Sequence, residues 1–315
     1  MDAVFIGSSE AAVGVLHELR TGGLLVKLIV SRPDRKAGRG RSYIATPVSK
    51  YARSVDAQLI TPDSWKDGKA LEDVRATEAP VIIVASYGRV LPTELLIIPE
   101  HGVLNIHPSI LPAYRGPSPV VTALLEGVGA TGVTVMELDE GLDTGPIVAQ
   151  REVGIGATES GANLEKRLFG VGARLLLDIL PGWVNGEVLS QKQEEGKATY
   201  TKRISKKDGR IDWNKPTVAI MNQIRAFDPW PSSYVVWDGN ILKILEVMVG
   251  TNVDPRGSPQ IPGEITRYYV SGRVFPSIKT SDGTLVLARM QREGRGVITG
   301  HEFLNGYPKF IGAYL

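Results

Sequence analysis

The sequence predicts an α/β fold with a Rossmann-like, mostly parallel sheet, followed by a small C-terminal β-barrel of the OB type. Two observations support this prediction. Over the first half, apolar runs of strand length alternate with helical patterns, as in βαβ units. From about residue 205, short β-rich runs follow one another between Gly, Asp and Pro, as in a small barrel. The length of 315 residues suits two domains.

The first half supplies strands and helices in a regular order. Segment 9–20 has apolar residues at helical spacing, and it lies between the strand-like runs 3–7 and 24–31. Strands that alternate with helices in this way favour a sheet covered by helices on both faces. The apolar segments that continue the pattern are 80–86, 102–107, 119–127, 132–138 and the helical 162–180.

The pattern changes at a polar stretch, 189–209, which reads as a linker crossing the surface. One helical segment, 217–227, then precedes the β-rich runs. We therefore expect an N-terminal α/β domain over 1–188, a linker over 189–204 and a C-terminal β-barrel domain over 205–315.

The composition is that of an ordinary globular protein that can bury a sizeable core, with 43% hydrophobic residues and a mean hydropathy of −0.03. The absence of cysteine excludes a disulfide framework, a thiolate nucleophile and a thiolate metal site. The N-terminus lacks the pattern of a signal peptide, and no apolar run approaches the roughly 18 residues of a membrane span. We expect a cytoplasmic protein.

Charge is unevenly distributed along the chain, although its net value is only +2. Residues 201–315 contain 16 Lys and Arg against 10 Asp and Glu, which leaves 20 against 24 for residues 1–200. The basic excess of the second part suggests an anionic partner there.

Three familiar sites are excluded by their motifs. Gly7 and Gly14 do not fit G-x-G-x-x-G, and the second strand ends in Ser-Arg instead of an acidic residue, so a dinucleotide site is not expected. A P-loop motif is also absent. The run Leu-Asp-Thr-Gly at 142–145 resembles an aspartic-protease strand, but the second such carboxylate that those enzymes need does not occur.

The stretch NIHPSILPAYRG, which begins at Asn105, brings polar chemistry to the end of a buried strand. Asn105 and His107 lie two positions apart and therefore share one face. Ligands of open α/β sheets bind beyond the carboxyl ends of the strands, where both side chains are expected. The prolines of the following turn fix its backbone and are expected to leave free the N–H groups of Ser109, Ile110 and Leu111.

A second loop, ELDEGLDTGP, follows another strand and carries Asp139, Glu140 and Asp143. An amide, an imidazole and a carboxylate from neighbouring strand ends suit acyl transfer to an amine. The amide and an imidazolium stabilise an oxyanion, and the carboxylate orients the histidine and takes a proton. No covalent nucleophile is offered, so direct transfer is favoured. The same residues also suit structural roles, His107 as a satisfied strand-end residue and Asn105 and Asp143 as turn residues.

At these residues the sequence resembles the formyltransferases that use 10-formyltetrahydrofolate. NIHPSILPAYRG with GLDTGPI is similar to that family's Asn…His…Ser-Leu-Leu-Pro…Asp signature, with Ile110 in place of the commoner Leu. By motif, Asn105, His107 and Asp143 match the catalytic triad. VASYGRVLP at 84–92 resembles the loop that flanks the pterin pocket. The resemblance implies folate contacts from Ser109, Ile110, Leu111, Pro112, Tyr87, Gly88, Val90, Leu91, Asp139 and Leu142.

Further segments resemble the methionyl-tRNA formyltransferase branch of this family. SRPDRKAGRGRSYIATPVSKYA (31–52) is similar to an inserted loop of that branch. ATYTKRISKKDGRIDW (198–213) and IRAFDPWPSSYV (224–235) are similar to its linker and the start of its C-terminal barrel. GSSEAAV and GPSPVVTALLEG depart from the usual pattern beside the cleft. The resemblance implies a tRNA partner contacted by Arg35, Lys36, Arg39, Arg41, Lys206, Lys207 and Arg210.

The activity that the resemblance implies is transfer of the formyl group of 10-formyltetrahydrofolate to the α-amino group of methionine on initiator Met-tRNA. Asn105 and His107 would hold the oxyanion, and Asp143 would assist removal of the amine proton. No metal is expected, because no His and carboxylate cluster has ligand spacing, and no membrane or protein partner is implied. A sugar-nucleotide N-formyltransferase, a formyltetrahydrofolate hydrolase and a non-enzymatic tRNA-binding protein are the alternatives left open.

Overall fold

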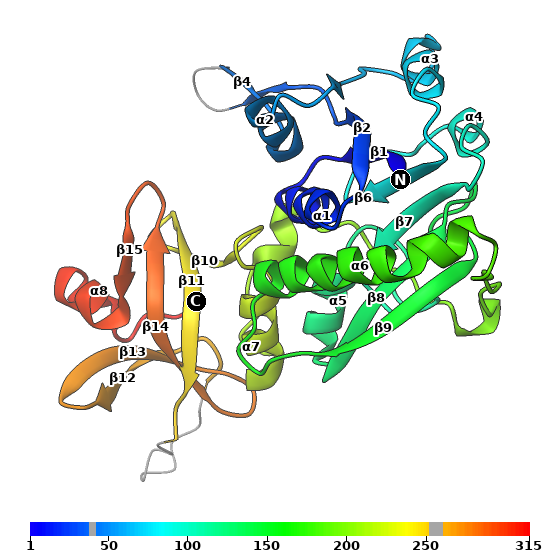
Figure 1. Ribbon diagram of the computed structural model, residues 1–315. Coiled ribbons are helices and arrows are strands. Elements are labelled where there is room, and N and C mark those ends of the chain that lie inside the picture. The colour runs from blue at the N-terminus through cyan, green and yellow to red at the C-terminus, as the bar shows by residue number, and fades with distance from the viewer. Residues whose placement is uncertain (38–41, 252–260) are drawn as a thin grey trace. The chain divides into compact units, whose positions relative to one another are not determined.

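The computed structural model describes residues 1–37, 42–251 and 261–315, and the chain divides into two compact units (Figure 1). Each unit is made of several separate sequence segments, because two short segments from the first half of the sequence belong to the second unit. The first unit is Met1–Pro119, Gly129–Ile155 and Asn163–Lys202, and the second is Val120–Val128, Gly156–Ala162 and Arg203–Leu315.

The first unit is built on a seven-stranded sheet in the order β5-β2-β1-β6-β7-β8-β9. The pairs from β5 to β7 are parallel, whereas β8 and β9 add two antiparallel strands at one edge. The prediction of a mostly parallel α/β sheet is therefore confirmed. Its elements are β1 (Asp2–Gly7), α1 (Glu10–Thr21), β2 (Leu25–Val30), β3 (Arg35–Ala37), β4 (Ser42–Ile44), α2 (Pro47–Ser54), β5 (Leu59–Ile60), α3 (Lys69–Arg75), β6 (Val81–Ala85), α4 (Thr93–Leu96), β7 (Val103–His107), β8 (Ala130–Glu137), β9 (Ile147–Gly154), α6 (Gly161–Val184) and the 3-10 turn η1 (Glu195–Lys197).

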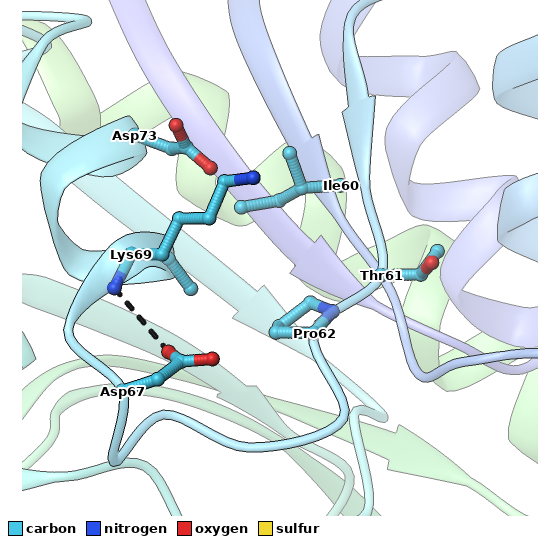
Figure 2. Close-up of a pocket in the computed structure, with 7 residues that line it drawn as sticks. Ile60, Thr61, Pro62, Asp67, Lys69 and Asp73 are labelled. Atoms are coloured by element: carbon cyan, nitrogen blue, oxygen red, sulfur yellow. Dashed lines mark hydrogen bonds between the residues drawn. The ribbon is translucent and has the colours of Figure 1, made fainter.

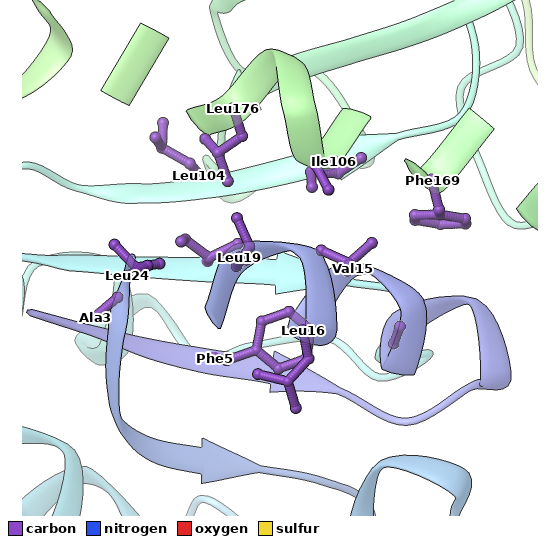
Figure 3. Packing of buried hydrophobic residues seen from close by; sticks show 14 of the residues in the cluster. Ala3, Phe5, Val15, Leu16, Leu19, Leu24, Leu104, Ile106, Phe169 and Leu176 are labelled. Carbon is purple, nitrogen blue, oxygen red and sulfur yellow. The ribbon is translucent and has the colours of Figure 1, made fainter. Parts of the chain in front are cut away.

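Alternate residues of the central strands enter two different cores. On one face, Phe5 and Ile106 pack with Leu16 of α1 and Phe169 of α6, as Figure 3 shows. On the other face, the alternate strand residues pack against α3 and α4. Because side chains alternate along a strand, His107 lies on the face opposite Ile106. The two faces thus separate the α1–α6 core from the side chains of the predicted site.

The second unit is built on an antiparallel sheet in the order β10-β11-β14-β13-β12, with β15 also paired to β14. Helix α7 packs its apolar residues on this sheet in one core. The elements of the unit are α5 (Pro119–Glu126), η2 (Lys206–Gly209), α7 (Thr217–Ala226), β10 (Ser233–Trp237), β11 (Asn240–Val249), β12 (Ile265–Val270), β13 (Arg273–Lys279), β14 (Thr284–Arg292), β15 (Val297–Thr299), α8 (Gly300–Gly306) and η3 (Pro308–Phe310).

The described residues do not form the closed barrel that the sequence predicted. Strands β10 and β12 remain at opposite ends of the sheet and do not pair with each other. Other parts of the unit pair with the outer edges of both strands. Arg210 forms a β-bridge with Tyr234 of β10. The N–H of Ile265 in β12 donates to the oxygen of Ala313, and the oxygen of Ile265 accepts from the N–H of Gly312. These bonds occupy the edge groups that closure would have used.

Most of the predicted linker is part of the first unit. The segment Gln191–Thr201, called here the return segment, runs back over that unit and pairs with it through backbone hydrogen bonds. Gln191 pairs with Ile147 at the start of β9, and Tyr200 bridges to Arg115. Separately, no helix in the described parts of the chain is long and apolar enough to cross a membrane.

Candidate active site

The carboxyl ends of β1, β6 and β7 meet at one edge of the first unit's sheet, because these strands are parallel neighbours. Strand β7 ends at His107, and Asn105 lies two residues earlier on the same face. Asn105 is half-buried, and its side-chain amide forms no hydrogen bond within the described residues. His107 is almost fully buried. The strand thus presents one uncommitted amide beside one buried imidazole.

The two ring nitrogens of His107 face different partners. Nε2 lies 3.1 Å from the backbone oxygen of Tyr114, and Nδ1 lies 3.7 Å from Oδ2 of Asp143. A carbonyl oxygen only accepts hydrogen bonds, so Nε2 must carry the proton of the neutral ring. Nδ1 is then the basic nitrogen, and it faces the carboxylate at a distance too long for a direct hydrogen bond.

Burial lowers the pKa of His107 below its ordinary value, while the charge of Asp143 and the hydrogen bond to Tyr114 act in the opposite direction. Burial lowers the pKa because it removes the water that would solvate the charged imidazolium, and it is the largest of the three influences. At neutral pH the ring is therefore mainly neutral. It can accept a proton at Nδ1, and the carboxylate beside that atom stabilises the charge that results.

Asp143 reaches His107 by a route that differs from the sequence prediction. The prediction placed its loop at a neighbouring carboxyl end, but β8 is antiparallel to β7, so β8 ends beside Leu104, near the amino end of β7. The loop then runs back along β7. Its beginning is fixed by a hydrogen bond from the N–H of Leu138 to the oxygen of Val103, and Asp143 lies further on, beside His107.

Backbone geometry and one N–H group position the Asp143 side chain. Oδ2 accepts a hydrogen bond of 2.7 Å from the N–H of Gly116. Asp143 has a φ of 54°, in the left-handed region that Asp tolerates better than most residues. Two residues later, a Cβ atom at Gly145 would collide with the backbone of Glu137, so the loop needs glycine there. This loop is closely constrained by its neighbours.

The turn after β7 is held by a buried polar network. Thr134 Oγ1 donates to the oxygen of Ser109 at 2.7 Å and accepts from the N–H of Leu111 at 3.1 Å. Gln150 Nε2 donates to the oxygen of Leu111 at 2.8 Å and to Thr134 Oγ1 at 2.9 Å. The N–H of Ser109 bonds to the oxygen of His107. The expectation that the N–H groups of Ser109 and Leu111 are free is therefore wrong, because the turn uses them internally.

The other residues expected to contact folate lie on the loops that follow β6, β7 and β8. Val90 and Leu142 are exposed apolar side chains, with 90% and 57% of their surface accessible. Tyr87 is buried, and its hydroxyl has no hydrogen-bond partner in the described residues. Asp139 is engaged within its own loop, where its carboxylate accepts from Thr144. The remaining members are Ser109, Ile110, Leu111 and Pro112 in the turn and Gly88 and Leu91 after β6.

The residues expected to contact tRNA are divided between the two units. Arg35 is exposed on β3, which also contains Lys36. Arg39 and Arg41 lie outside the described residues. In the second unit, η2 contains Lys206 and Lys207, and Arg210 follows it directly.

Arg115 and Gln193 are parts of the site that the sequence did not indicate. Arg115 is fully buried, and its guanidinium binds the Gln193 and Glu195 side chains of the return segment. Gln193 in turn donates to backbone oxygens of the Asp143 loop. The only signal in the sequence is an arginine inside the motif NIHPSILPAYRG; nothing in the pattern links it to a residue nearly eighty positions later.

The described residues of the first unit include hollows in its surface. One, of about 200 Å³, adjoins the turn after β7 and is lined by Ile110, Ala113, Tyr114, Ala130, Thr131 and Glu152. Another, of about 260 Å³, lies beyond β5 and contains Lys69, whose N–H donates to Asp67 (Figure 2). Among the predicted site residues that the structure describes, Ile110 lines the first of these hollows, and the others line neither. Within the described residues, no group of three or more His, Asp or Glu side chains is placed to hold a metal ion.

Comparison with protein-family models matches both parts of the chain. Residues 1–180 match the family described as formyl transferase, and residues 203–308 match the formyl transferase C-terminal domain. Methionyl-tRNA formyltransferase of Chloroflexus aggregans is 39% identical over 306 residues, which cover 97% of this chain and 97% of that protein. The protein of the same name from Geobacter sulfurreducens is 34% identical over 304 residues, 96% of this chain and 93% of that protein.

Solved structures share the fold at lower identity. An N-formyltransferase from Helicobacter canadensis, in complex with folinic acid and dTDP-3-aminofucose, is 19% identical with a TM-score of 0.64, covering 92% of this chain and 98% of that chain. HypX from Aquifex aeolicus in complex with tetrahydrofolic acid is 17% identical with a TM-score of 0.60, covering 90% of this chain and 48% of that chain.

Proposed function

Because the chain belongs to the formyltransferase family, we propose that it transfers the formyl group of 10-formyltetrahydrofolate to the α-amino group of methionine on initiator Met-tRNA. The choice of acceptor is supported by the full-length similarity to proteins named methionyl-tRNA formyltransferase. The proposed type of reaction is supported by the pair of His107 and Asp143, in which the basic nitrogen of a buried imidazole faces a carboxylate.

In this proposal His107 first acts as a base. As the amine nitrogen forms its bond to the formyl carbon, Nδ1 of His107 takes the amine proton, and the carbonyl oxygen of the formyl group becomes an oxyanion. Asp143, 3.7 Å away, stabilises the imidazolium. When the bond from the formyl carbon to the folate nitrogen breaks, the imidazolium returns the proton to that nitrogen. The lowered pKa of His107 supports this cycle, because a base must start neutral.

Asn105 donates to the oxyanion from its side-chain amide. It is suited to this role because its amide has no other hydrogen bond within the described residues, so it need not break an existing bond as charge develops. Protonated His107 is the second donor. The folate supplies the activated formyl group when bound. Apolar exposed side chains on the loops after β6 and β8, Val90 and Leu142, fit the planar ring of such a co-substrate.

The two units divide the work in this proposal. Residues of the first unit bind the folate and perform the transfer. The second unit binds tRNA phosphates with Lys206, Lys207 and Arg210. In the N-terminal sequence, the basic residues Arg35, Lys36, Arg39 and Arg41 are proposed to bind the acceptor end. An excess of basic residues over 201–315 supports this division.

A transfer assay with three acceptors tests the proposal. The protein is supplied with 10-formyltetrahydrofolate and either Met-tRNA, an amino-sugar nucleotide or water alone, and formylated product and released formate are measured. We expect formyl-Met-tRNA as the main product. Preferential formylation of the amino sugar, or release of formate at the same rate without an acceptor, would refute the choice of Met-tRNA.

A further inference from the structure

We infer that Gln193 is a positioning residue that holds the Asp143 loop against His107, an inference that rests on the proposed function for its catalytic meaning. Gln193 lies on the return segment, fifty residues after Asp143. Its buried side chain donates hydrogen bonds directly to the backbone of that loop. The stretch expected to be a surface linker therefore completes the candidate site.

Both ends of the Gln193 amide are used. Nε2 donates to the backbone oxygens of Asp143, at 2.9 Å, and Gly145, at 2.7 Å. Oε1 accepts from Nε and Nη2 of Arg115, at 3.0 and 2.9 Å. Because arginine only donates and carbonyl oxygens only accept, the orientation of the amide is fixed. One side chain thus connects a buried cation to two carbonyl groups on either side of residue 144.

Arg115 gives this connection a rigid base. Its guanidinium has no exposed surface, and it forms a bidentate ion pair with Glu195 at 2.7 and 3.0 Å. Tyr200 accepts a further hydrogen bond from it. The backbone of Arg115 is also fixed, since its N–H donates to Thr199 and its oxygen accepts from Thr201. A buried guanidinium is tolerated only when its donors are satisfied, and here the return segment satisfies them.

The Asp143 loop needs such a support because it runs back along β7 as a loop and is not a strand of the sheet. It leaves the sheet beside Leu104 and must run back along the strand to reach His107. The N–H of Gly116 fixes the carboxylate, and Gln193 fixes the backbone on which that carboxylate is carried. A displacement of about 1 Å in a catalytic group can cost roughly a hundredfold in rate. The separation of 3.7 Å between Nδ1 and Oδ2 depends on both supports.

The variant Gln193→Glu isolates this link. A carboxylate still accepts from Arg115, but it has no N–H to donate, and it places negative charge against the two carbonyl oxygens of the loop. Gln191→Glu is the matched control. Gln191 lies two residues earlier on the same segment, and its exposed side chain has no hydrogen bond within the described residues. The two variants make the same change of charge.

In Gln193→Glu we expect kcat to fall about 10- to 100-fold with little change in the KM for folate. Gln191→Glu should retain the wild-type rate. The ring titration of His107, followed by NMR in the neutral variant Gln193→Asn, should move to lower pH, because the Asp143 charge that raises the pKa of His107 is displaced and no new charge is introduced. Asp143 is the charged group that faces this ring, and the Tyr114 oxygen is its other partner.

The double variant with Asp143→Asn separates positioning from general support of the fold. If Gln193 acts through Asp143, adding Gln193→Glu to Asp143→Asn should reduce kcat by less than about twofold further. Multiplied effects and an unchanged His107 titration would overturn the inference. If Gln193→Glu does not fold, Gln193→Asn, whose shorter amide cannot reach both partners, is expected to give the same pattern with a smaller loss. The His107 titration needs no substrate, so it tests the inference even if Met-tRNA is not formylated.

Discussion

His107 combines two opposing influences on one ring. Burial lowers its pKa below the ordinary value of 6.5, so between that lowered pKa and 6.5 the unfolded chain binds a proton that the folded chain does not. The free energy of unfolding should therefore fall as the pH drops through this window, by up to about 1.4 kcal/mol per pH unit from this group. His107→Gln should flatten the decline. Urea denaturation at several pH values checks this, and an equally steep decline in the variant would contradict it.

The charge of Asp143 should be visible in the pH dependence of the proposed reaction. Asp143→Asn removes the influence that raises the pKa of His107, so the pKa falls further. We expect the acid limb of the kcat profile to move to lower pH while the maximum rate falls about 10²- to 10³-fold. A single-turnover assay across pH measures both effects. A limb that moves to higher pH would show that Asp143 does not stabilise the imidazolium.

Asn105 tests the oxyanion role at the scale of one amide. Asn105→Ala should reduce kcat about 10²- to 10³-fold and leave the affinity for folate nearly unchanged, because the hydrogen bond that it removes forms only as charge develops. Steady-state kinetics and folate titration give the two values. A raised folate dissociation constant with an unchanged kcat would instead assign this amide to ligand binding.

For single residues, the sequence indicated those whose role can be recognised from their near neighbours in the chain. Asn105 and His107 share a face because strand residues alternate, a rule that needs no tertiary information. Arg115 and Gln193 were missed because their roles depend on a contact between segments almost eighty residues apart. The expectation of a free N–H group at Leu111 was wrong for the same reason, because its partner Thr134 lies on a different strand. The N–H of Ser109, in contrast, bonds locally to the oxygen of His107.

The turn after β7 depends as an element on Thr134. Its buried hydroxyl bonds to Ser109, Leu111 and Gln150, so Thr134→Val leaves these polar groups without that partner. We expect a loss of about 1–3 kcal/mol in the free energy of unfolding, together with weaker folate binding. Thr131→Val on the same strand is the control, because the buried Thr131 hydroxyl has no hydrogen-bond partner in the described residues. Equal stability of the two variants in urea would contradict the role of the network.

Element directions were harder to predict than element positions. The apolar run 132–138 marks β8 (Ala130–Glu137) closely, but periodicity carries no information on whether a strand is parallel to its neighbour. Because β8 is antiparallel to β7, the loop with Asp143 begins at the far end of β7 and must return along it. The carboxylate still meets the imidazole, by a path that only the tertiary structure reveals.

On the scale of the whole molecule, the two-part organisation was predictable from the change in pattern near residue 205, but its exact membership was not. Segments 120–128 and 156–162 belong to the second unit although they lie within the first half of the sequence. The open sheet in place of a barrel has a similar cause. Edge pairing with residues 312–313, at the end of the chain, is a long-range interaction that strand-length runs cannot indicate.

Charge distribution over the whole chain leads to a last prediction, on tRNA binding. Basic residues that bind phosphates release counterions, so removing one such residue should reduce the slope of log K against log salt by roughly 0.7–0.9. Arg39→Ala with Arg41→Ala should therefore weaken Met-tRNA binding, flatten its salt dependence and leave folate binding unchanged. The pair Arg20→Ala and Arg75→Ala, at exposed helix ends, removes the same charge as a control and should keep the wild-type slope. Filter binding from low to high salt measures the slopes. If both pairs behave alike, total charge and not the 31–52 segment governs binding, and the residues that bind tRNA must be sought in the second unit.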